Sequence, residues 1–175
     1  MSREFFIGDT HFNDGRIMRY ERGEFEDVLA MNEAIIKAWD EKVNSKDIVY
    51  HLGDVGINGQ ENLEDIMKQL PGQKCLVLGN HDLVHPYEYW LDIGFCRVYE
   101  HPICIHEFYW LSHAPMYLNQ NMPYVNIHGH IHRNIIFTPG TKNQYVNVSV
   151  EHQLPNGPME WKEIQEYFSG KKEKK

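Results

Sequence analysis

Short apolar runs that end in glycine and a polar side chain recur in this sequence, and they constrain its fold most strongly. The runs lie in "EFFIGDTH", "DIVYHLGD" and "KCLVLGNHD", and each is too brief for a helix, so it is typical of a strand. Between the second and third runs, Leu63, Ile66, Met67 and Leu70 mark a helix that "PG" ends. Strand, helix and strand at this spacing predict a right-handed parallel βαβ unit, so the first third of the chain is expected to be α/β.

The remaining patterns predict a single domain over residues 1–170. Residues 27–43 carry an apolar stripe at helical spacing behind Asp27, a residue type that favours the helix N-cap. After residue 95, strand-like runs follow one another with little helical spacing, so this half is expected to be mostly sheet. An amphipathic stretch after Pro158 predicts a closing helix, and residues 171–175 are interpreted as a flexible basic tail.

Composition disfavours several classes of protein. A hydrophobic content of 42% indicates a packed core, and a formal net charge of −8 disfavours binding to nucleic acid by bulk electrostatics. Cys75, Cys96 and Cys104 are odd in number and lack C-x-x-C spacing, which indicates reduced thiols rather than a disulfide scaffold or a zinc ribbon. The sequence shows no signal-peptide pattern and no apolar run near the ~18 residues of a membrane span, so we expect a cytoplasmic protein without membrane contact.

Side chains that bind metals or transfer protons follow the predicted strand ends. They are Asp9, His11, Asp54, Asn80, His81, Asp82, His113, His130 and His132. Ligand sites in parallel sheets gather outside the carboxyl ends of the strands, so these residues are expected to converge. Residues i and i+2 on an extended backbone point the same way, which predicts that Asp9 and His11 form one pair and His130 and His132 another.

The chemistry of this set predicts a pair of metal ions. Nitrogen and oxygen ligands without a thiolate suit Mn, Fe, Zn, Ni or Co, and they disfavour a pure oxygen cage for Ca or Mg. The candidate ligands are too many for one ion, whereas two ions about 3.5 to 4 Å apart that share a carboxylate would use them all and would form a clamp for in-line displacement at phosphorus. Two divalent ions bring +4 and Asp9 with Asp54 return −2, so the residual charge is expected to attract an anionic phosphate ester.

Five segments, in order along the chain, resemble the motifs of the calcineurin-like metallophosphoesterases. That family has the pattern D-x-H, G-D, G-N-H-[DE], H and G-H-x-H, and this sequence has "DTH" at 9–11, "GD" at 53–54, "GNHD" at 79–82, His113 and "GHIH" at 129–132. The resemblance implies an α/β fold, a four-layer α-β-β-α sandwich of two mixed sheets flanked by helices. Both metals would lie at the strand ends.

The resemblance also implies a role for each motif residue. Asp9, His11 and His132 would hold one ion, Asn80, His113 and His130 would hold the other, and Asp54 would bridge them. His81 would bind no metal; it would face the phosphate and protonate or stabilise the leaving oxygen. Asp82 is expected to orient the loop. Many family members extend the second motif to G-D-x-x-D, whose last residue pairs with the acidic histidine, and Ile57 stands at that position here, which leaves open what orients His81.

The predicted function is a dinuclear metal-dependent phosphoesterase. A metal-bound hydroxide would attack phosphorus in a small phosphate ester, and phosphodiesters are expected to be better substrates than monoesters. Mn is the expected metal, with Fe, Zn, Ni or Co as alternatives. Two other functions stay open: a nuclease that acts on DNA or RNA ends, which the acidic balance disfavours, and a non-catalytic scaffold of the same fold that binds a protein. No obligate protein partner is evident from the sequence.

Other charged residues and histidines have interpretations of their own. Arg16, Arg19 and Arg22 at i, i+3 and i+6 would either clamp a substrate phosphate or form a solvated helical face, and interleaved glutamates favour the solvated face. Arg133 leaves the same choice open. The histidines outside the motifs are interpreted as ordinary surface or core residues: His51, His85, His101, His106, His128 and His152.

Overall fold

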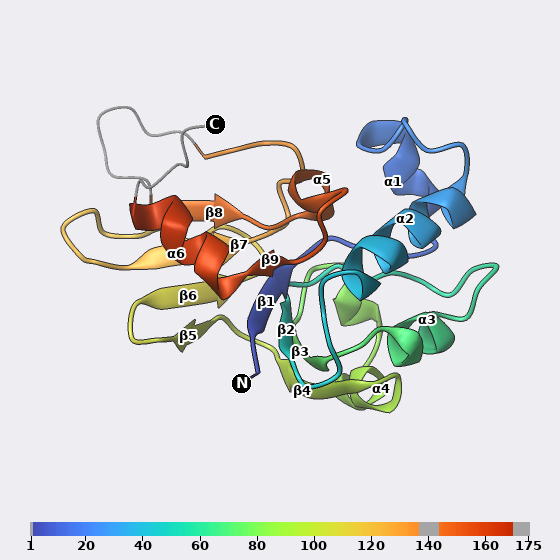
Figure 1. Cartoon of the computed structure of the whole chain (residues 1–175), viewed down its shortest axis with the longest axis horizontal. Helices are drawn as coiled ribbons and strands as arrows, with labels where there is room; N and C mark the ends of the chain where they lie inside the picture. The colour runs from blue at the N-terminus through green and yellow to red at the C-terminus, as the bar shows by residue number, and fades with distance from the viewer. Residues whose placement is uncertain (1, 137–143, 170–175) are drawn as a thin grey trace.

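A five-stranded mixed sheet forms one half of the molecule (Figure 1). The computed structural model describes residues 2–136 and 144–169. The strand order is β4-β3-β2-β1-β9, with bounds β1 (Glu4–Ile7), β2 (Ile48–His51), β3 (Gln73–Val77), β4 (Phe95–Tyr99) and β9 (Met159–Glu160). The strands β1 to β4 are parallel, as the βαβ pattern predicts, and β9 is antiparallel to β1.

A four-stranded mixed sheet forms the other half. Its order is β5-β6-β7-β8, with bounds β5 (Ile103–Ile105), β6 (Tyr109–Ser112), β7 (Val125–His128) and β8 (Tyr145–Asn147). The strands β6, β7 and β8 are parallel, and β5 is antiparallel to β6. The predicted α/β fold of two mixed sheets flanked by helices is confirmed.

Three of the described helices, α2, α3 and α6, lie where the apolar spacing predicts them. Their bounds are α1 (Gly15–Tyr20), α2 (Val28–Asp40), α3 (Leu63–Gln69), the 3-10 turn η1 (Asp82–Val84), α4 (Tyr87–Asp92), α5 (Val150–Gln153) and α6 (Trp161–Ser169). Asp27 is the N-cap of α2, as expected, and its side chain accepts a hydrogen bond from Ala30 N at 2.8 Å. The helix ends at Asp40, earlier than predicted, although Val43 beyond it stays buried.

Two hydrophobic cores lie on opposite faces of the first sheet, because alternate side chains of a strand point in opposite directions. Phe5 and Ile7 pack into a core with residues of α2, α3 and α4, among them Trp39. Phe6 lies between them in sequence and packs into a second core with Leu111 and other residues of the second sheet. A parallel strand buried on both faces reads as a continuous apolar run, which is the pattern that the sequence shows.

The two sheets meet where β1 and β8 end. Gly8 N donates to Val148 O at 2.8 Å, and Val150 N donates to Gly8 O at 3.0 Å, so the chain after β1 lies beside the chain after β8. This backbone connection brings the carboxyl ends of parallel strands from both sheets to one place. Side chains that follow those strands can therefore converge.

No helix among residues 2–136 and 144–169 is long and apolar enough to cross a membrane. The predicted basic tail at 171–175 lies outside the described residues.

Candidate metal centre

The sequence-predicted metal ligands lie just after strands of both sheets. Asp9 and His11 follow β1, Asp54 follows β2, Asn80 follows β3, His113 follows β6, and His130 and His132 follow β7. The structure brings them into two groups whose nitrogen and oxygen atoms lie within 4.8 Å of one another. One group is Asp9, His11 and His132, and the other is Asp54, His113 and His130.

Hydrogen-bond acceptors converge in the second group. Nε2 of His113 lies 3.0 Å from Asn80 Oδ1, 3.0 Å from His130 Nδ1 and 3.4 Å from Asp54 Oδ2. Nδ1 of His113 lies 2.8 Å from Leu52 O. A carbonyl oxygen only accepts hydrogen bonds, so Nδ1 must carry the proton of this contact. In a neutral imidazole the single proton is then on Nδ1, so Nε2 turns a lone pair toward three other polar atoms. Lone pairs that face one another need a proton or a cation between them, and a metal ion fits this arrangement.

An unpaired buried nitrogen marks the first group. Nε2 of His11 is buried without a hydrogen-bond partner in the described structure, and it lies 3.6 Å from Asp54 Oδ2. The same carboxylate oxygen is 3.4 Å from His113 Nε2 of the second group. Buried polar atoms are rarely left unsatisfied, so the orphaned nitrogen fits a ligand atom. One oxygen of Asp54 thus faces imidazoles of both groups.

The backbone at these residues is not extended. Asp9 and His11 fall into one group, as the i and i+2 spacing predicts, whereas the prediction that His130 and His132 form a pair is wrong. Positive φ angles occur at Asp9 (56°), His11 (46°), Asp54 (56°), His130 (69°) and His132 (48°). These residues lie in turns beyond the strand ends, so the alternation of a strand does not apply to them. His130 and His132 point into different groups for this reason. Left-handed backbone is uncommon outside glycine and gathers at functional sites.

Two motif glycines leave room for the carboxylates. A Cβ atom on Gly79 would collide with Asp54 Oδ1, and a Cβ atom on Gly129 would collide with Asp9 Oδ2. The glycine that opens "GNHD" therefore lets the third strand end approach Asp54. The glycine that opens "GHIH" does the same for Asp9, whose carboxylate oxygens accept from His130 N at 3.0 and 2.9 Å.

Asp82 joins two of the loops through backbone hydrogen bonds. Its Oδ2 accepts from Asp54 N at 2.8 Å and from Gly79 N at 2.7 Å, and its Oδ1 accepts from Val55 N at 2.9 Å. The residue is 1% exposed. Three backbone donors on one buried carboxylate fix the loop after β2 against the loop after β3, which is the orienting role expected for Asp82.

His81 lies at the rim of the two groups. Its side chain is 51% exposed, and Nε2 lies 4.0 Å from Asp54 Oδ2. The backbone N–H of His81 donates to Asp54 Oδ1 at 2.9 Å. The ring stands edge-on to His11, with 5.4 Å between the ring centres. Ile57 N donates to Phe12 O at 2.9 Å and Ile57 O accepts from Asn13 Nδ2 at 3.0 Å, so the hydrogen bonds of Ile57 join it to the loop after β1. The position of His81 comes instead from its contacts with Asp54 and His11.

Burial and charge shift the pKa values of the central residues. Burial raises the pKa of Asp9 to about 6, and burial lowers the pKa of His11 to about 3. Burial would also lower the pKa of His113, but the hydrogen bond and charge of Asp54 and the charge of Asp9 raise it to about 9. Burial opposes ionisation of Asp54, yet the hydrogen bond and charge of His113 lower its pKa to about 2. Without a cation, a proton on His113 therefore neutralises Asp54.

A buried row of charged side chains, which the sequence analysis does not predict, lies behind the first group. Oε1 of Glu151 accepts from Arg22 Nε at 2.8 Å and lies 3.1 Å from His132 Nδ1. The contact fixes the proton of His132 on Nδ1 and turns Nε2 toward Asp9 and His11. Arg22 also donates to the carbonyls of Asp9 and Thr10.

The interpretation of Arg22 as part of a phosphate clamp or a solvated face is wrong, because the residue is 1% exposed. Its partner Glu151 follows β8, just as the motif residues follow their strands. Ser149, also after β8, donates to Asp9 Oδ2 at 2.7 Å. The strand-end rule, applied to this strand as well, would have found both residues.

The other arginines and the histidines outside the motifs join neither group. Arg16 pairs with Asp14, and Arg133 binds Glu21 O and the Glu24 carboxylate at the surface. Two of these histidines contact the loops of the groups: His152 Nε2 lies 2.8 Å from His132 O, and His51 Nε2 lies 2.9 Å from the hydroxyl of Thr10.

Comparison with known proteins identifies relatives of unknown activity. The family model described as calcineurin-like phosphoesterase matches residues 4–172. The uncharacterized protein MJ1445 of Methanocaldococcus jannaschii is 38% identical over 84 residues, which cover 47% of this chain and 48% of that protein. The gene 66 protein of Mycobacterium phage L5 is 37% identical over 89 residues, which cover 49% of this chain and 42% of that protein. The matched stretch thus spans less than half of each relative.

A solved structure shows the same fold. The crystal structure of the protein of unknown function AQ665 from Aquifex aeolicus has a TM-score of 0.70 against this chain. It covers 95% of this chain and 100% of its own, at 24% sequence identity. At that identity, the likeness concerns the fold alone.

Replacement of Glu151 by Gln should weaken metal binding. The amide keeps the shape of the side chain but removes the charge that makes His132 a strong ligand, and such losses typically cost about 10- to 100-fold in affinity. Isothermal titration of the metal-free protein with Mn²⁺ measures the change. Glu64→Gln, an exposed residue that pairs with Lys68, serves as the matched control and should bind as the unaltered protein does. Equal affinity in both variants would contradict the role of Glu151.

Metal binding should release a proton near neutral pH. The pKa of His113 is raised to about 9, so below that pH the imidazole carries a proton that a metal must displace. Affinity should therefore rise about tenfold per pH unit from 6 to 9, and fall more steeply below about 6, where Asp9 also takes up a proton.

Titration with Mn²⁺ at pH 7.5, in buffers of different ionisation enthalpy, should show about one proton released from His113. His106→Gln, which alters an exposed histidine that pairs with Glu4, should show the same release. A binding heat that does not depend on the buffer would refute the protonated state of His113.

Proposed function

Since the chain belongs to the calcineurin-like phosphoesterase family, as the resemblance of its motifs predicts, we propose that it hydrolyses phosphodiesters with two divalent metal ions. The family implies a metal-dependent phosphoesterase in general. The preference for diesters, the ligand assignment and the roles of single residues are the proposal. The observation that carries it is the convergence of two groups of nitrogen and oxygen ligands on one oxygen of Asp54.

The residues that would hold the metals follow from the grouping. Asp9, His11 and His132 would bind one ion, and Asn80, His113 and His130 would bind the other. Asp54 would bridge them, since its Oδ2 faces imidazoles from both groups. Two divalent ions at this place would supply an activated water and positive charge for the phosphoryl oxygens. The set has no thiolate, and mixed imidazole and carboxylate ligands suit Mn, Fe, Zn, Ni or Co; we propose Mn as the metal to test first.

His81 would serve the leaving oxygen. It is exposed at the rim, and its Nε2 lies 4.0 Å from Asp54 Oδ2, the oxygen that faces both groups. A group at that place can donate a proton to an oxygen that departs from phosphorus. The contacts with Asp54 and His11 hold the ring, which is the role that a further aspartate has in many relatives.

A diester preference is supported by the openness of the centre. The side chains of His81 and His130 are exposed, so the surface on both sides of Asp54 can admit substituents on phosphorus. A closed site around a single phosphoryl group would instead favour a monoester.

The experiment uses protein loaded with Mn²⁺ and compares bis(p-nitrophenyl) phosphate with p-nitrophenyl phosphate. The unaltered protein should bind about two metals per chain and hydrolyse the diester with the higher kcat/KM. Asp54→Ala should lose both metal occupancy and activity, because it removes the shared ligand. His81→Ala should keep its metals and lose about 10²- to 10⁴-fold in kcat, which is the usual contribution of a general acid. His106→Ala is the control histidine and should behave as the unaltered protein.

Other outcomes would separate the alternatives. Two bound metals without hydrolysis of any ester would favour a scaffold that binds a protein. Cleavage of oligonucleotide ends at a higher kcat/KM than either aryl ester would favour the nuclease. Normal turnover by the His81→Ala variant would refute the role of His81 and leave the metal centre in place.

A further inference from the structure

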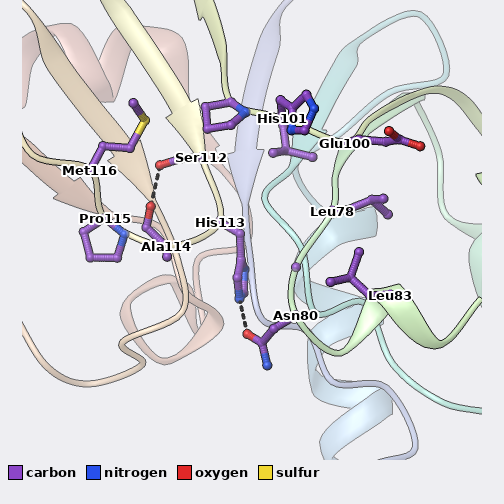
Figure 2. Close-up of a pocket in the computed structure, with 13 residues that line it drawn as sticks. Leu78, Asn80, Leu83, Glu100, His101, Ser112, His113, Ala114, Pro115 and Met116 are labelled. Carbon is purple, nitrogen blue, oxygen red and sulfur yellow. Dashed lines mark hydrogen bonds between the residues drawn. The ribbon is translucent and has the colours of Figure 1, made fainter.

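A cavity of about 400 Å³ adjoins the second ligand group (Figure 2). It is lined by the end of β3 and the loop after it, by residues 100–102 between β4 and β5, and by the end of β6 with the residues that follow. Asn80 and His113 belong both to its lining and to the proposed metal ligands. A molecule bound in the cavity would therefore lie beside the metal ion proposed for the second group. The volume lies within the usual range for small-molecule sites, roughly 300–1,000 Å³.

The walls of the cavity are mostly apolar. Leu78 and Leu83 lie on one side, and Ala114, Pro115 and Met116 lie on the other (Figure 2). Leu83 is 69% exposed, which is a large apolar surface for one side chain beside a polar centre. A ligand that covered these side chains would gain the free energy of removing apolar surface from water.

Few polar groups of the cavity are free to bind a ligand. The hydroxyl of Ser112 donates to Ala114 O at 2.7 Å and accepts from Asn126 Nδ2 at 2.9 Å, so it is already paired. Glu100 and His101 lie at the end of the cavity away from Asn80 (Figure 2). Among the described lining residues there is no lysine or arginine. A second anionic group would meet the carboxylate of Glu100 without a cation to hold it.

The cavity and His81 lie beside different imidazoles of the centre. The ring of His81 packs against His11 of the first group, whereas the cavity is bounded by His113 of the second. His81 is not among the described lining residues. In an in-line displacement, the leaving oxygen lies on the reaction axis and the retained substituents lie around it. The group that stays on phosphorus is thus the one that can reach the cavity.

On the premise that the chain is the phosphodiesterase proposed above, the geometry points to the cavity as the binding site for the retained ester group, and to an uncharged, mostly apolar group such as an aryl ring as its occupant. A monoester would leave the apolar walls in water. A nucleic-acid strand would bring a further phosphate toward Glu100. The cavity therefore selects for a small diester with one neutral, apolar ester group, and it accounts for a preference over monoesters and over nucleic acid.

The test compares diesters that share one leaving group. Methyl p-nitrophenyl phosphate and phenyl p-nitrophenyl phosphate both release p-nitrophenolate and differ only in the retained group. The Mn-loaded protein should prefer the phenyl ester by about tenfold or more in kcat/KM, mostly through KM, because even one methylene in an apolar pocket changes specificity by roughly 10- to 200-fold. Leu83→Gln and Met116→Gln should each reduce this preference by about three- to tenfold.

Val84→Gln is the matched control. Val84 follows Leu83 in η1, is 74% exposed and does not line the cavity, so the variant should keep the full preference. The intrinsic reactivities of the two esters differ, but the difference cancels when a variant is compared with the unaltered protein. Hydrolysis with the same phenyl-to-methyl ratio in all four proteins would overturn the proposed role of the cavity.

A binding measurement separates this inference from the proposed function. Benzyl(methyl)phosphinate, in which a CH2 group replaces the ester oxygen of the aryl group and no ester bond remains to be hydrolysed, is titrated into the Mn-loaded proteins by calorimetry. Weaker binding to Leu83→Gln than to Val84→Gln would support the cavity even if no ester were hydrolysed, and the absence of hydrolysis would then count against the proposed function alone. Equal binding to both variants would overturn the cavity as an aryl site.

Discussion

Buried nitrogen and oxygen atoms that face one another are the constraint on which the rest of this structure depends. His11 Nε2 lies 3.6 Å and His113 Nε2 lies 3.4 Å from Asp54 Oδ2. His11 Nε2 has no hydrogen-bond partner in the described structure. Such an arrangement is costly unless protons or metal ions occupy it. Contacts between the loops keep these groups together, because loops that are joined cannot move apart to expose each group to water.

Rigidity comes from the backbone and from glycines at fixed places. The loop after β1 hydrogen-bonds to the loop after β2 through Asp9 N and His11 N, and Asp82 ties the loop after β2 to the loop after β3. Left-handed φ angles at the ligand residues then aim side chains in directions that a strand would not allow. Because Gly79 and Gly129 carry no Cβ, the loops pack closely enough for carboxylates of one to meet the ligands of another.

The sequence predicts which residues gather at the strand ends better than it predicts the local backbone geometry there. Apolar runs identify strands, and a rule about the carboxyl ends of parallel strands is enough to gather Asp9, Asp54 and His113 at one edge. The same reasoning fails at His130 and His132, because a left-handed turn is not visible in an alternating pattern. It also misjudges Arg22, because the burial of this arginine depends on a contact with a residue 129 positions away. Local spacing carries no information about such a partner.

The pairing of Arg22 with Glu151 has an electrostatic consequence for an anionic substrate. If two divalent ions bind, Asp9 and Asp54 leave a net charge of +2, which attracts phosphate. The carboxylate of Glu151, buried beside His132, would by itself reduce that charge to +1, although it is needed to orient the imidazole. The guanidinium of Arg22, held 2.8 Å from the carboxylate and away from solvent, cancels the charge of Glu151. The protein can thus orient His132 with a carboxylate without lowering the positive charge that two bound ions would bring to the centre.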